Sequence, residues 1–431
     1  MILVKDKIVL FLDFKTYTKN SSKLYDYSSD EKKEINTIIE KGTYIIRKDR
    51  KIIRVDKQSD IEAKKGEELL FHIRNNKNGT FMLENPVPTK NTPFTEDNIN
   101  NLNNKIWYIL QKNNSNTKKE NENYLLCVND IIKMGNIKLI VQKIHINHLE
   151  QLKGKEIKAN DKEEQEEKEG INKNYDINSL NKEGGPIFNF LPQPKNYFIS
   201  KEKAKNEGKE CYICHSTECN KDNPIISFCD CNDVHFTCLK EELKKKVTNI
   251  ENKKKTVKNY YINGYNCKKC NYIYPLKFKI EEIEQPFNLI DIDEPKGCDY
   301  IIFESIEYKV YYGYLKLVFV IQLNNEPIKI GRKKDNDMII RDPSISKIHA
   351  ELNYDKKQGK IILKNENEKY GTLILIKKSL KINENKIKLQ IGRTIIEANI
   401  MKKGEFEKII NKNTQNPLPK KEQNSKQFFI I

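Results

Sequence analysis

The chain carries the motifs CYIC at residues 211–214, CDC at 229–231, HFTC at 235–238 and CKKC at 267–270. A short motif of this kind presents two sulfur or nitrogen ligands to one metal ion, and zinc takes four such ligands in a tetrahedron. The donors form four pairs: Cys211 and Cys214, Cys229 and Cys231, His235 and Cys238, Cys267 and Cys270. Eight donors predict two zinc ions, which would organise a segment with few large apolar residues of its own.

The order of these ligands, with histidine in fifth place, resembles the RING-CH (RING-variant) zinc finger and also fits the PHD finger. Both families use a cross-brace, so the resemblance assigns the first and third pairs to one zinc and the second and fourth to the other. The Cys-x-Cys pair and Leu239 after Cys238 favour RING-CH. The aromatic Tyr265, two residues before the seventh ligand, keeps the PHD alternative open. Cys219 is left over and is interpreted as a loop thiol.

A RING-type finger would imply ubiquitin ligase activity. The resemblance then gives Ile213 and Leu243 the docking surface for a ubiquitin-conjugating enzyme. Glu242 stands where the RING-CH family usually has tryptophan, and the segment between the sixth and seventh ligands is long and basic. A structural or protein-binding finger is therefore the alternative interpretation of the same motifs.

Downstream of the cysteines, alternating strand-like runs extend from Asp299 to Met401 and contain KIGR at 329–332, SISKIHA at 344–350 and YGT at 370–372. These elements, in this order, resemble the forkhead-associated (FHA) domain, a β-sandwich that binds phosphothreonine peptides. The resemblance implies phosphopeptide contacts from one set of residues and structural roles for Gly331 and His349. The implied contacts are Arg332, Ser346, Lys347, Tyr370, Gly371 and Thr372. The family usually has asparagine where this chain has Tyr370, and the runs at 387–400 fit its closing strands.

The chemistry agrees with this resemblance. A phosphothreonine carries about −1.5 to −2 charges and three acceptor oxygens. The Arg332 guanidinium offers it a fork of donors, Lys347 a point charge and Ser346 a hydroxyl. The same resemblance makes His349 a brace inside the loop rather than a ligand or catalyst.

Residues 1–150 contain short alternating runs separated by Asn, Gly, Pro and Lys clusters, which predicts a β-rich domain. Asn78-Gly79-Thr80 and the run 129–135 hint at a second, degenerate FHA-like fold, and an ordinary turn at Asn-Gly is the alternative. We therefore expect a multidomain chain with a β-sandwich C-terminal domain, a small α+β finger and a β-rich N-terminal domain. The expected ranges are 1–150, a charged and polar linker at 151–205, the finger at 206–280, a connector at 281–298, the FHA domain at 299–401 and a tail at 402–431.

Composition bounds the remaining choices. No stretch of the 431 residues reaches the roughly 20 apolar residues that cross a bilayer, and the first residues lack a signal-peptide core. We expect a cytoplasmic or nuclear protein with no membrane partner, where clustered cysteines hold metal rather than form disulfides. The formal charge of +17 comes from lysine scattered along the whole chain, so a solvated surface is favoured over a nucleic-acid groove.

The sequence has no phosphate-binding loop of the Gly-x4-Gly-Lys type, no Gly-x-Ser-x-Gly motif and no His-Glu-x2-His motif. The first hypothesis is a zinc-binding signalling adaptor that binds a phosphothreonine-containing protein. The second is a ubiquitin ligase that selects phosphorylated substrates and engages a conjugating enzyme. The third is a nucleic-acid binder driven by net charge.

Overall fold

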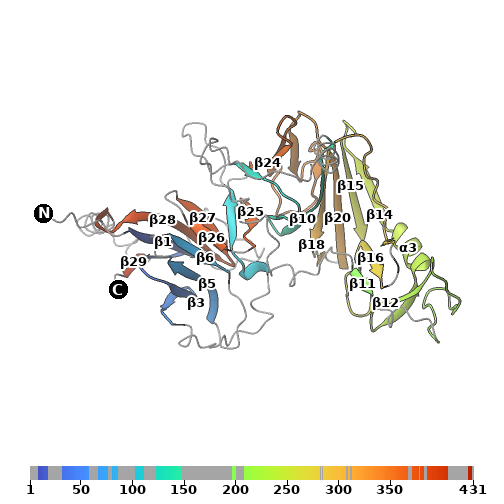
Figure 1. Cartoon of the computed structure of the whole chain (residues 1–431), viewed down its shortest axis with the longest axis horizontal. Coiled ribbons are helices and arrows are strands. Elements are labelled where there is room, and N and C mark those ends of the chain that lie inside the picture. The colour runs from blue at the N-terminus through green and yellow to red at the C-terminus, as the bar shows by residue number, and fades with distance from the viewer. Residues whose placement is uncertain are drawn as a thin grey trace, which may run out of the picture.

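The computed structural model describes residues 8–17, 32–57, 67–75, 80–85, 102–110, 123–147, 197–199, 208–281, 283, 285–306, 309–310, 313–366, 371–377, 379–382, 386–405 and 426–429. Strands dominate these ranges (Figure 1), which confirms the expected β-rich class. The expected linker lies outside them except for β11 (Tyr197–Ile199). No helix in the described ranges is long and apolar enough to cross a bilayer.

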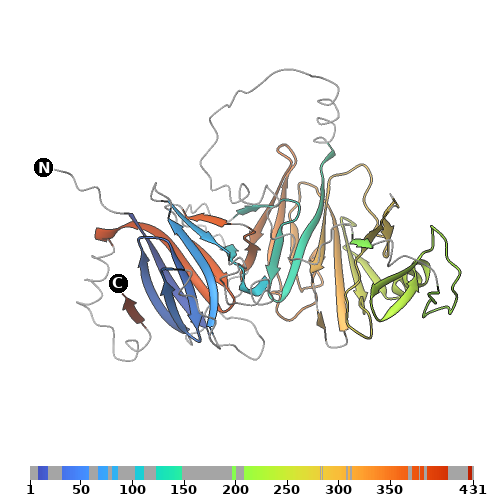
Figure 2. The same cartoon turned by 60° about the horizontal axis from the view of Figure 1, so that its bottom comes forward.

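Two β-sandwiches lie side by side, and a 14-stranded sheet runs through both of them (Figure 2). The first sandwich uses the part of this sheet with the order β7-β27-β28-β1-β2-β29, covered by a second sheet with the order β26-β6-β5-β3-β4. Phe14 on β1 and Phe71 on β5 stack across the two layers with ring centroids 6.4 Å apart. Its strands are β1 (Ile8–Tyr17), β2 (Lys32–Ile39), β3 (Thr43–Lys48), β4 (Lys51–Val55), β5 (Glu67–Asn75), β6 (Phe81–Glu84), β7 (Trp107–Leu110), β26 (Ser379–Ile382), β27 (Ile387–Ile391), β28 (Thr394–Lys402) and β29 (Lys426–Phe429).

The second sandwich uses the order β20-β18-β10-β9-β25 of the large sheet, covered by a sheet with the order β22-β21-β23-β24-β8. The side chains of β23 and β24 alternate between buried and partly exposed, as expected for strands with one face on a core. Its strands are β8 (Asn123–Leu125), β9 (Ile131–Met134), β10 (Ile137–His145), β18 (Tyr300–Ile306), β20 (Gly313–Gln322), β21 (Ile328–Gly331), β22 (Met338–Ile339), β23 (Ala350–Asp355), β24 (Lys360–Asn365) and β25 (Thr372–Leu375); the short β19 (Lys309–Val310) pairs with β20.

The two sandwiches exchange their closing strands. β28 pairs with β1 from Ile8 opposite Lys402 to Thr16 opposite Thr394, so the last strands of the C-terminal half complete the first sandwich. Reciprocally, β10 pairs with β18 and β8 pairs with β24, so strands from residues 123–145 complete the second. The runs at 387–400, which fitted the closing strands of the 299–401 range, therefore lie in the other sandwich.

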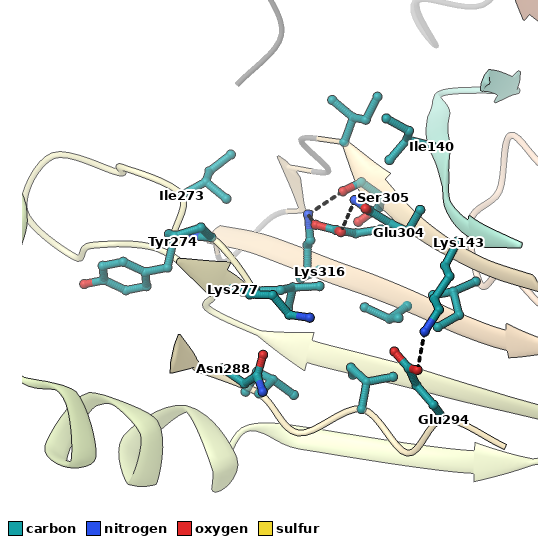
Figure 3. Close-up of a pocket in the computed structure, with 18 of the residues that line it drawn as sticks. Ile140, Lys143, Ile273, Tyr274, Lys277, Asn288, Glu294, Glu304, Ser305 and Lys316 are labelled. Carbon is teal, nitrogen blue, oxygen red and sulfur yellow. Dashed lines mark hydrogen bonds and ion pairs between the residues drawn. The ribbon is translucent and has the colours of Figure 1, made fainter. Parts of the chain in front are cut away.

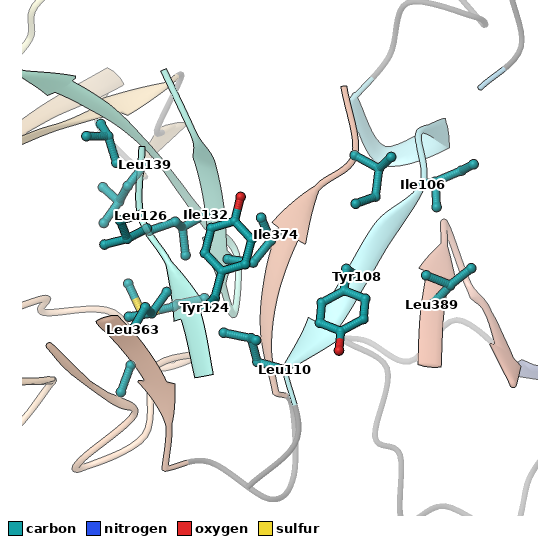
Figure 4. Close-up of a cluster of buried hydrophobic side chains, with 14 of the residues drawn as sticks. Ile106, Tyr108, Leu110, Tyr124, Leu126, Ile132, Leu139, Leu363, Ile374 and Leu389 are labelled. Carbon is teal, nitrogen blue, oxygen red and sulfur yellow. The ribbon is translucent and has the colours of Figure 1, made fainter. Parts of the chain in front are cut away.

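The exchange occurs where β7 and β25 pair with each other, Thr372 opposite Leu110. One hydrophobic cluster runs through this crossover into both sandwiches. Figure 4 shows Tyr108 and Leu389 on one side of it and Tyr124, Leu126 and Leu363 on the other.

Polar contacts lock the crossover. The buried Asn85 accepts a hydrogen bond from the Ile106 amide at 2.7 Å and donates one to the Ile376 carbonyl at 2.6 Å. The Lys377 ammonium lies 3.1 Å from the Asp130 carboxylate, and both side chains are buried. Because Asp130 also accepts the Cys127 amide at 2.7 Å, this pair ties the segment before β9 to the segment before β26.

The cysteine-rich segment docks on the outer face of the large sheet. It contains β12 (Ile225–Cys229), β13 (Asn232–His235), α3 (Phe236–Lys244), β14 (Val247–Glu251), β15 (Val257–Asn263), β16 (Lys277–Ile280) and β17 (Phe287–Asn288). The β14–β15 hairpin extends the large sheet, with β15 antiparallel to β20. A second hydrophobic cluster packs Leu239, Leu243 and Phe278 against Val318 and Val320 of β20. Sheets and cores thus cross the expected boundaries between the N-terminal, finger and C-terminal ranges.

Candidate metal centres and anion-binding loops

Two groups of four donor atoms converge in the cysteine-rich segment. The first contains Cys211, Cys214, His235 and Cys238, and the second contains Cys229, Cys231, Cys267 and Cys270. Within each group the ligand atoms all lie within 4.8 Å of one another. These are the two sets that the cross-brace resemblance assigns, and each group can hold one metal ion.

The two Cys-x2-Cys turns share one backbone conformation. The Cys211 amide donates to the Ser216 carbonyl and the His215 amide to the Cys211 carbonyl, at 3.0 and 2.8 Å. In the second turn the Cys267 amide donates to Tyr272 and the Asn271 amide to Cys267, at 2.8 and 2.9 Å. His215 and Asn271 both have positive φ, 59° and 62°. The same turn therefore presents two sulfurs to each centre.

His235 is oriented for ligation through one specific nitrogen. Its Nε2 lies 2.6 Å from the Glu218 carbonyl, so this nitrogen carries the proton and donates it. The unprotonated Nδ1 faces the Sγ atoms of Cys214 and Cys238 at 3.2 and 3.9 Å. These distances bracket the edge of a zinc tetrahedron with Zn–S near 2.3 Å and Zn–N near 2.0 Å, which is about 3.6 Å. The Glu218 carbonyl thus fixes the orientation of the imidazole and keeps its proton on Nε2, as a hydrogen-bond partner does for a metal-binding histidine.

The thiols of each group differ in acidity. Burial alone would raise the pKa of Cys211, but amides donating to its sulfur, including that of His235 at 3.4 Å, bring the pKa to about 6. Burial raises the pKa of Cys229 and of Cys238 to about 12, and neighbouring cysteine sulfurs add to both shifts. Four sulfur ligands can all ionise in such a space only when a cation compensates their charge.

The two residues predicted to dock a conjugating enzyme, Ile213 and Leu243, do not form one exposed surface. Ile213 is 36% exposed, beside Tyr212 at 38%. Leu243 is fully buried in the cluster that joins α3 to the large sheet, so its assignment to a docking surface was wrong. The periodicity of α3 turns Leu239 and Leu243 inward together, since residues four apart share a helix face. Glu242, at the position where tryptophan is usual, lies 3.3 Å from the Tyr212 hydroxyl and 2.6 Å from the Lys246 ammonium.

Two loops of the second sandwich lie against each other at the end of β21. The amides of Arg332 and Lys333 donate to the carbonyls of Ser346 and Lys347, at 3.0 and 3.4 Å. A Cβ on Gly331 would lie 2.3 Å from the Lys347 carbonyl oxygen, so only glycine allows this approach. The contact leaves the side chains of Arg332 and Lys347 exposed and that of Ser346 partly exposed. The loops thus bring together three of the predicted phosphate contacts.

His349 joins these loops to the Gly-Thr element. The Ser346 amide donates to Nδ1 at 3.2 Å, so Nε2 carries the proton and donates to the Gly371 carbonyl at 3.1 Å. Burial lowers the pKa of this imidazole to about 4. A neutral, fully buried histidine with both nitrogens used matches the bracing role that the resemblance implies.

The Gly-Thr element itself faces inward. Gly371 and Thr372 are buried, and the Thr372 hydroxyl donates to the Asn365 side chain at 2.9 Å. In this conformation Thr372 braces β24 against β25, and Tyr370 lies outside the described residues.

Asn336 is a residue to which the sequence analysis assigned no role. Its buried amide donates to the Lys347 carbonyl at 2.6 Å and thereby holds the Arg332 loop against the Ser346 loop. Its place in Asp335-Asn336-Asp337, a turn-forming triplet after Gly-Arg, was the available signal.

A cavity of about 400 Å³ separates the cysteine-rich segment from the large sheet (Figure 3). Its floor carries Lys316, which pairs with Glu304 and donates to the Ser305 carbonyl at 2.7 Å. At its rim Lys143 pairs with Glu294 at 2.6 Å. In both ion pairs the cation and the carboxylate belong to residues that line the cavity, so these charges neutralise each other.

The FHA domain family model matches residues 328–396. No curated protein and no solved structure matched the chain. FHA domains bind phosphothreonine-containing proteins, so the matched range implies phosphopeptide-dependent protein interaction. The match includes the paired loops at Arg332 and Ser346, and it continues into β26–β28, which the structure places in the first sandwich.

Proposed function

We propose that this chain is a signalling adaptor that binds phosphothreonine-containing proteins through the loops of its second sandwich, with two zinc ions holding its finger together. The observation that carries the proposal is the backbone pairing of the Arg332 and Ser346 loops, braced by His349, inside the range that matches the FHA family. A cytoplasmic or nuclear location accompanies this proposal.

The side chains supply what a phosphothreonine requires. The Arg332 guanidinium reaches the phosphate with several donors, Ser346 adds a hydroxyl and Lys347 adds a charge. A hydrogen bond to an ionised group is worth about 1.5–3 kcal/mol, so the net loss of one such bond weakens binding by one to two orders of magnitude. Because the Arg332 side chain is exposed, its removal is expected to lower the affinity for the peptide and not the stability of the fold.

Titration of a phosphothreonine peptide library against the full chain tests this function. Wild type binds phosphorylated peptides and not their unphosphorylated forms, and Arg332→Ala binds about 10- to 100-fold more weakly. Arg393→Ala is a matched control, because that arginine lies in the first sandwich, where its guanidinium donates to the Asp49 carbonyl. Absence of binding by wild type, or equal binding by wild type and Arg332→Ala, rejects the proposal.

Zinc is the metal that the donor sets favour, since thiolate and imidazole ligands in tetrahedral sets of four suit this ion. Elemental analysis of the purified chain is expected to give two zinc ions per molecule. Cys267→Ser removes a ligand of the second group and lowers the content toward one, whereas Cys298→Ser, outside both groups, leaves it at two. Zinc-free protein from expression in zinc-supplied cells would exclude the metal.

The alternative function is a RING-CH-type ubiquitin ligase that selects phosphorylated substrates. The exposed Tyr212 and Ile213 beside the first metal group favour it. The ligand order supports the RING-CH relation, and the buried Leu243 removes half of the expected docking surface. An autoubiquitination assay with a panel of conjugating enzymes tests this activity, and Ile213→Ala is expected to abolish it. A negative result with every enzyme of the panel favours the adaptor function.

A further inference from the structure

Strand β22 leads out of the Arg332 loop and pairs on one side with β21, Gly331 opposite Ile339. Its other edge faces the β14–β15 hairpin of the cysteine-rich segment, which meets it with side chains instead of a backbone ladder. The Ile339 amide donates to Oδ1 of Asn259 at 3.0 Å, and the Tyr261 hydroxyl donates to the Ile339 carbonyl at 2.8 Å. Nδ2 of Asn259 approaches the Asp337 carbonyl at 3.4 Å.

Asn252 adds a contact from the hairpin turn. Its Nδ2 donates to the Asp337 carboxylate at 2.8 Å, while the other oxygen of that carboxylate accepts the Lys329 amide at 3.0 Å. The hairpin therefore contacts the Asp337–Ile339 end of the segment from Lys329 to Ile339 directly, and the Asp337 carboxylate links it to Lys329, two residues before Gly331. An edge strand of two residues has few other bonds to fix its position.

The hairpin is bifacial. Asn259 and Tyr261 point toward β22, while Tyr260 and Ile262, between and beside them on β15, pack in the cluster that contains Cys211 and Cys267. The hairpin is also inserted between the sixth and seventh metal ligands: α3, which carries Cys238, precedes it, and Cys267 follows it. One face thus rests on the metal-held core and the other on the anion-binding loop.

We infer that Asn259 is a positioning residue for the phosphopeptide site, and that through it the two metal centres set the affinity of the Arg332 loop for phosphopeptides. This rests on the proposed function of that loop. The hairpin's ladder with β20 opposes the coupling, because it would hold the hairpin in place without metal. The coupling requires that loss of the metal-held core shifts the β22-facing side chains in spite of this ladder.

Amide hydrogen exchange on the full, zinc-loaded chain tests the positioning without any ligand. Asn259→Ala removes the acceptor of the Ile339 amide, so amides between Gly331 and Ile340 are expected to exchange at least tenfold faster. Asn249→Ala is the matched control, since it removes an exposed asparagine from the same hairpin. Equal exchange in the two variants overturns the inference. If Asn259→Ala loses its zinc, Tyr261→Phe, which keeps the ring and removes only the hydroxyl, replaces it with the same expectation.

A thermodynamic cycle tests the coupling. The probe is the tightest phosphothreonine peptide from the library, measured on wild type and Asn259→Ala with zinc and after chelation. Zinc removal is expected to weaken peptide binding by wild type about tenfold and by Asn259→Ala less than threefold. The smaller loss is expected because the variant already lacks the Asn259 contact with β22. Equal losses in both proteins, or no loss in wild type, overturn the coupling. Failure of zinc-loaded wild type to bind any phosphopeptide rejects the proposed function instead, and the exchange experiment still decides the positioning.

Discussion

At the scale of single residues, the candidate sites depend on which nitrogen or which face a side chain presents. His235 has one ring nitrogen fixed by a backbone group, the Glu218 carbonyl, whereas His349 has both fixed, by the Ser346 amide and the Gly371 carbonyl. The first arrangement leaves Nδ1 free for a metal and the second leaves nothing free. Ligand spacing predicted the first role, and only the family resemblance predicted the second, because spacing does not show what surrounds an isolated histidine.

The buried His349 predicts a pH dependence of stability. Its pKa falls from 6.5 to about 4 on folding, so between these pH values the histidine is protonated in the unfolded chain and neutral in the folded chain. Stability is therefore lost as the pH falls from about 6.5 toward 4. Between pH 7 and pH 5 this one group accounts for about 2 kcal/mol of the free energy of unfolding.

Urea unfolding at both pH values, on wild type and on His349→Gln, isolates that contribution from the other acid-sensitive groups. The variant is expected to lose about 2 kcal/mol less than wild type over this interval. Parallel losses in the two proteins would show that His349 is protonated at pH 5 without penalty.

At the scale of elements, α3 and the β14–β15 hairpin distinguish this finger from a free-standing module. The segment between the sixth and seventh ligands is long and basic in sequence, but the sequence did not predict which part of the molecule it packs against. The continuous apolar run Tyr260–Ile262 is consistent with a strand covered on both faces, but it does not name the elements that cover it. In the structure those elements are the core of the cysteine-rich segment and the second sandwich.

Leu243 tests whether α3 is a structural helix or a docking helix. Leu243→Ala is expected to destabilise the finger by about 2–5 kcal/mol, because the side chain is fully buried against the large sheet. Ile213→Ala, at a 36% exposed position, is expected to change stability by less than about 0.5 kcal/mol. Limited proteolysis within residues 208–281 and thermal unfolding measure both. Equal stability of the two variants would mean that α3 does not pack as described.

At the scale of the whole molecule, the reciprocal exchange of strands makes the two halves one folding unit. Period-two alternation predicted many of these strands from the sequence, and the runs at 129–135 and 387–400 were both assigned to FHA-like folds. The sandwich that each run completes was not predictable, because two similar sandwiches offer each run equivalent edges. Contacts at the crossover, between residues far apart in sequence, determine which sandwich each run completes.

The Asp130–Lys377 pair is the charged part of that crossover. Lys377→Met leaves the buried Asp130 carboxylate without its cation and is expected to cost about 3–5 kcal/mol. The double variant Asp130→Asn, Lys377→Met removes both charges and keeps an acceptor for the Cys127 amide, so most of the loss is expected to return. Chemical denaturation of the three proteins measures this. A double variant as unstable as Lys377→Met would indicate that Lys377 stabilises the crossover through contacts other than this carboxylate.

The exchange itself can be tested by separating the halves. Residues 1–147 contain β8–β10, and residues 197–431 contain β26–β28, so each fragment lacks the strands that close its own sandwich in this structure. Co-expressed fragments are expected to purify as a complex. Each fragment expressed alone exposes unpaired strand edges and is expected to aggregate, since open edges recruit other strands.

Association alone does not distinguish the exchange from contact at the β7–β25 pairing, so a covalent probe completes the experiment. Phe11 and Asn399 are directly opposed on the outer face of β1 and β28. Directly opposed residues have Cα atoms about 4.5–5.5 Å apart, within the range that a disulfide spans. Phe11→Cys in one fragment and Asn399→Cys in the other should therefore link the fragments on oxidation, and neither single variant should. If each sandwich instead closes with its own strands, Asn399 lies on β18 rather than β1, and no link can form.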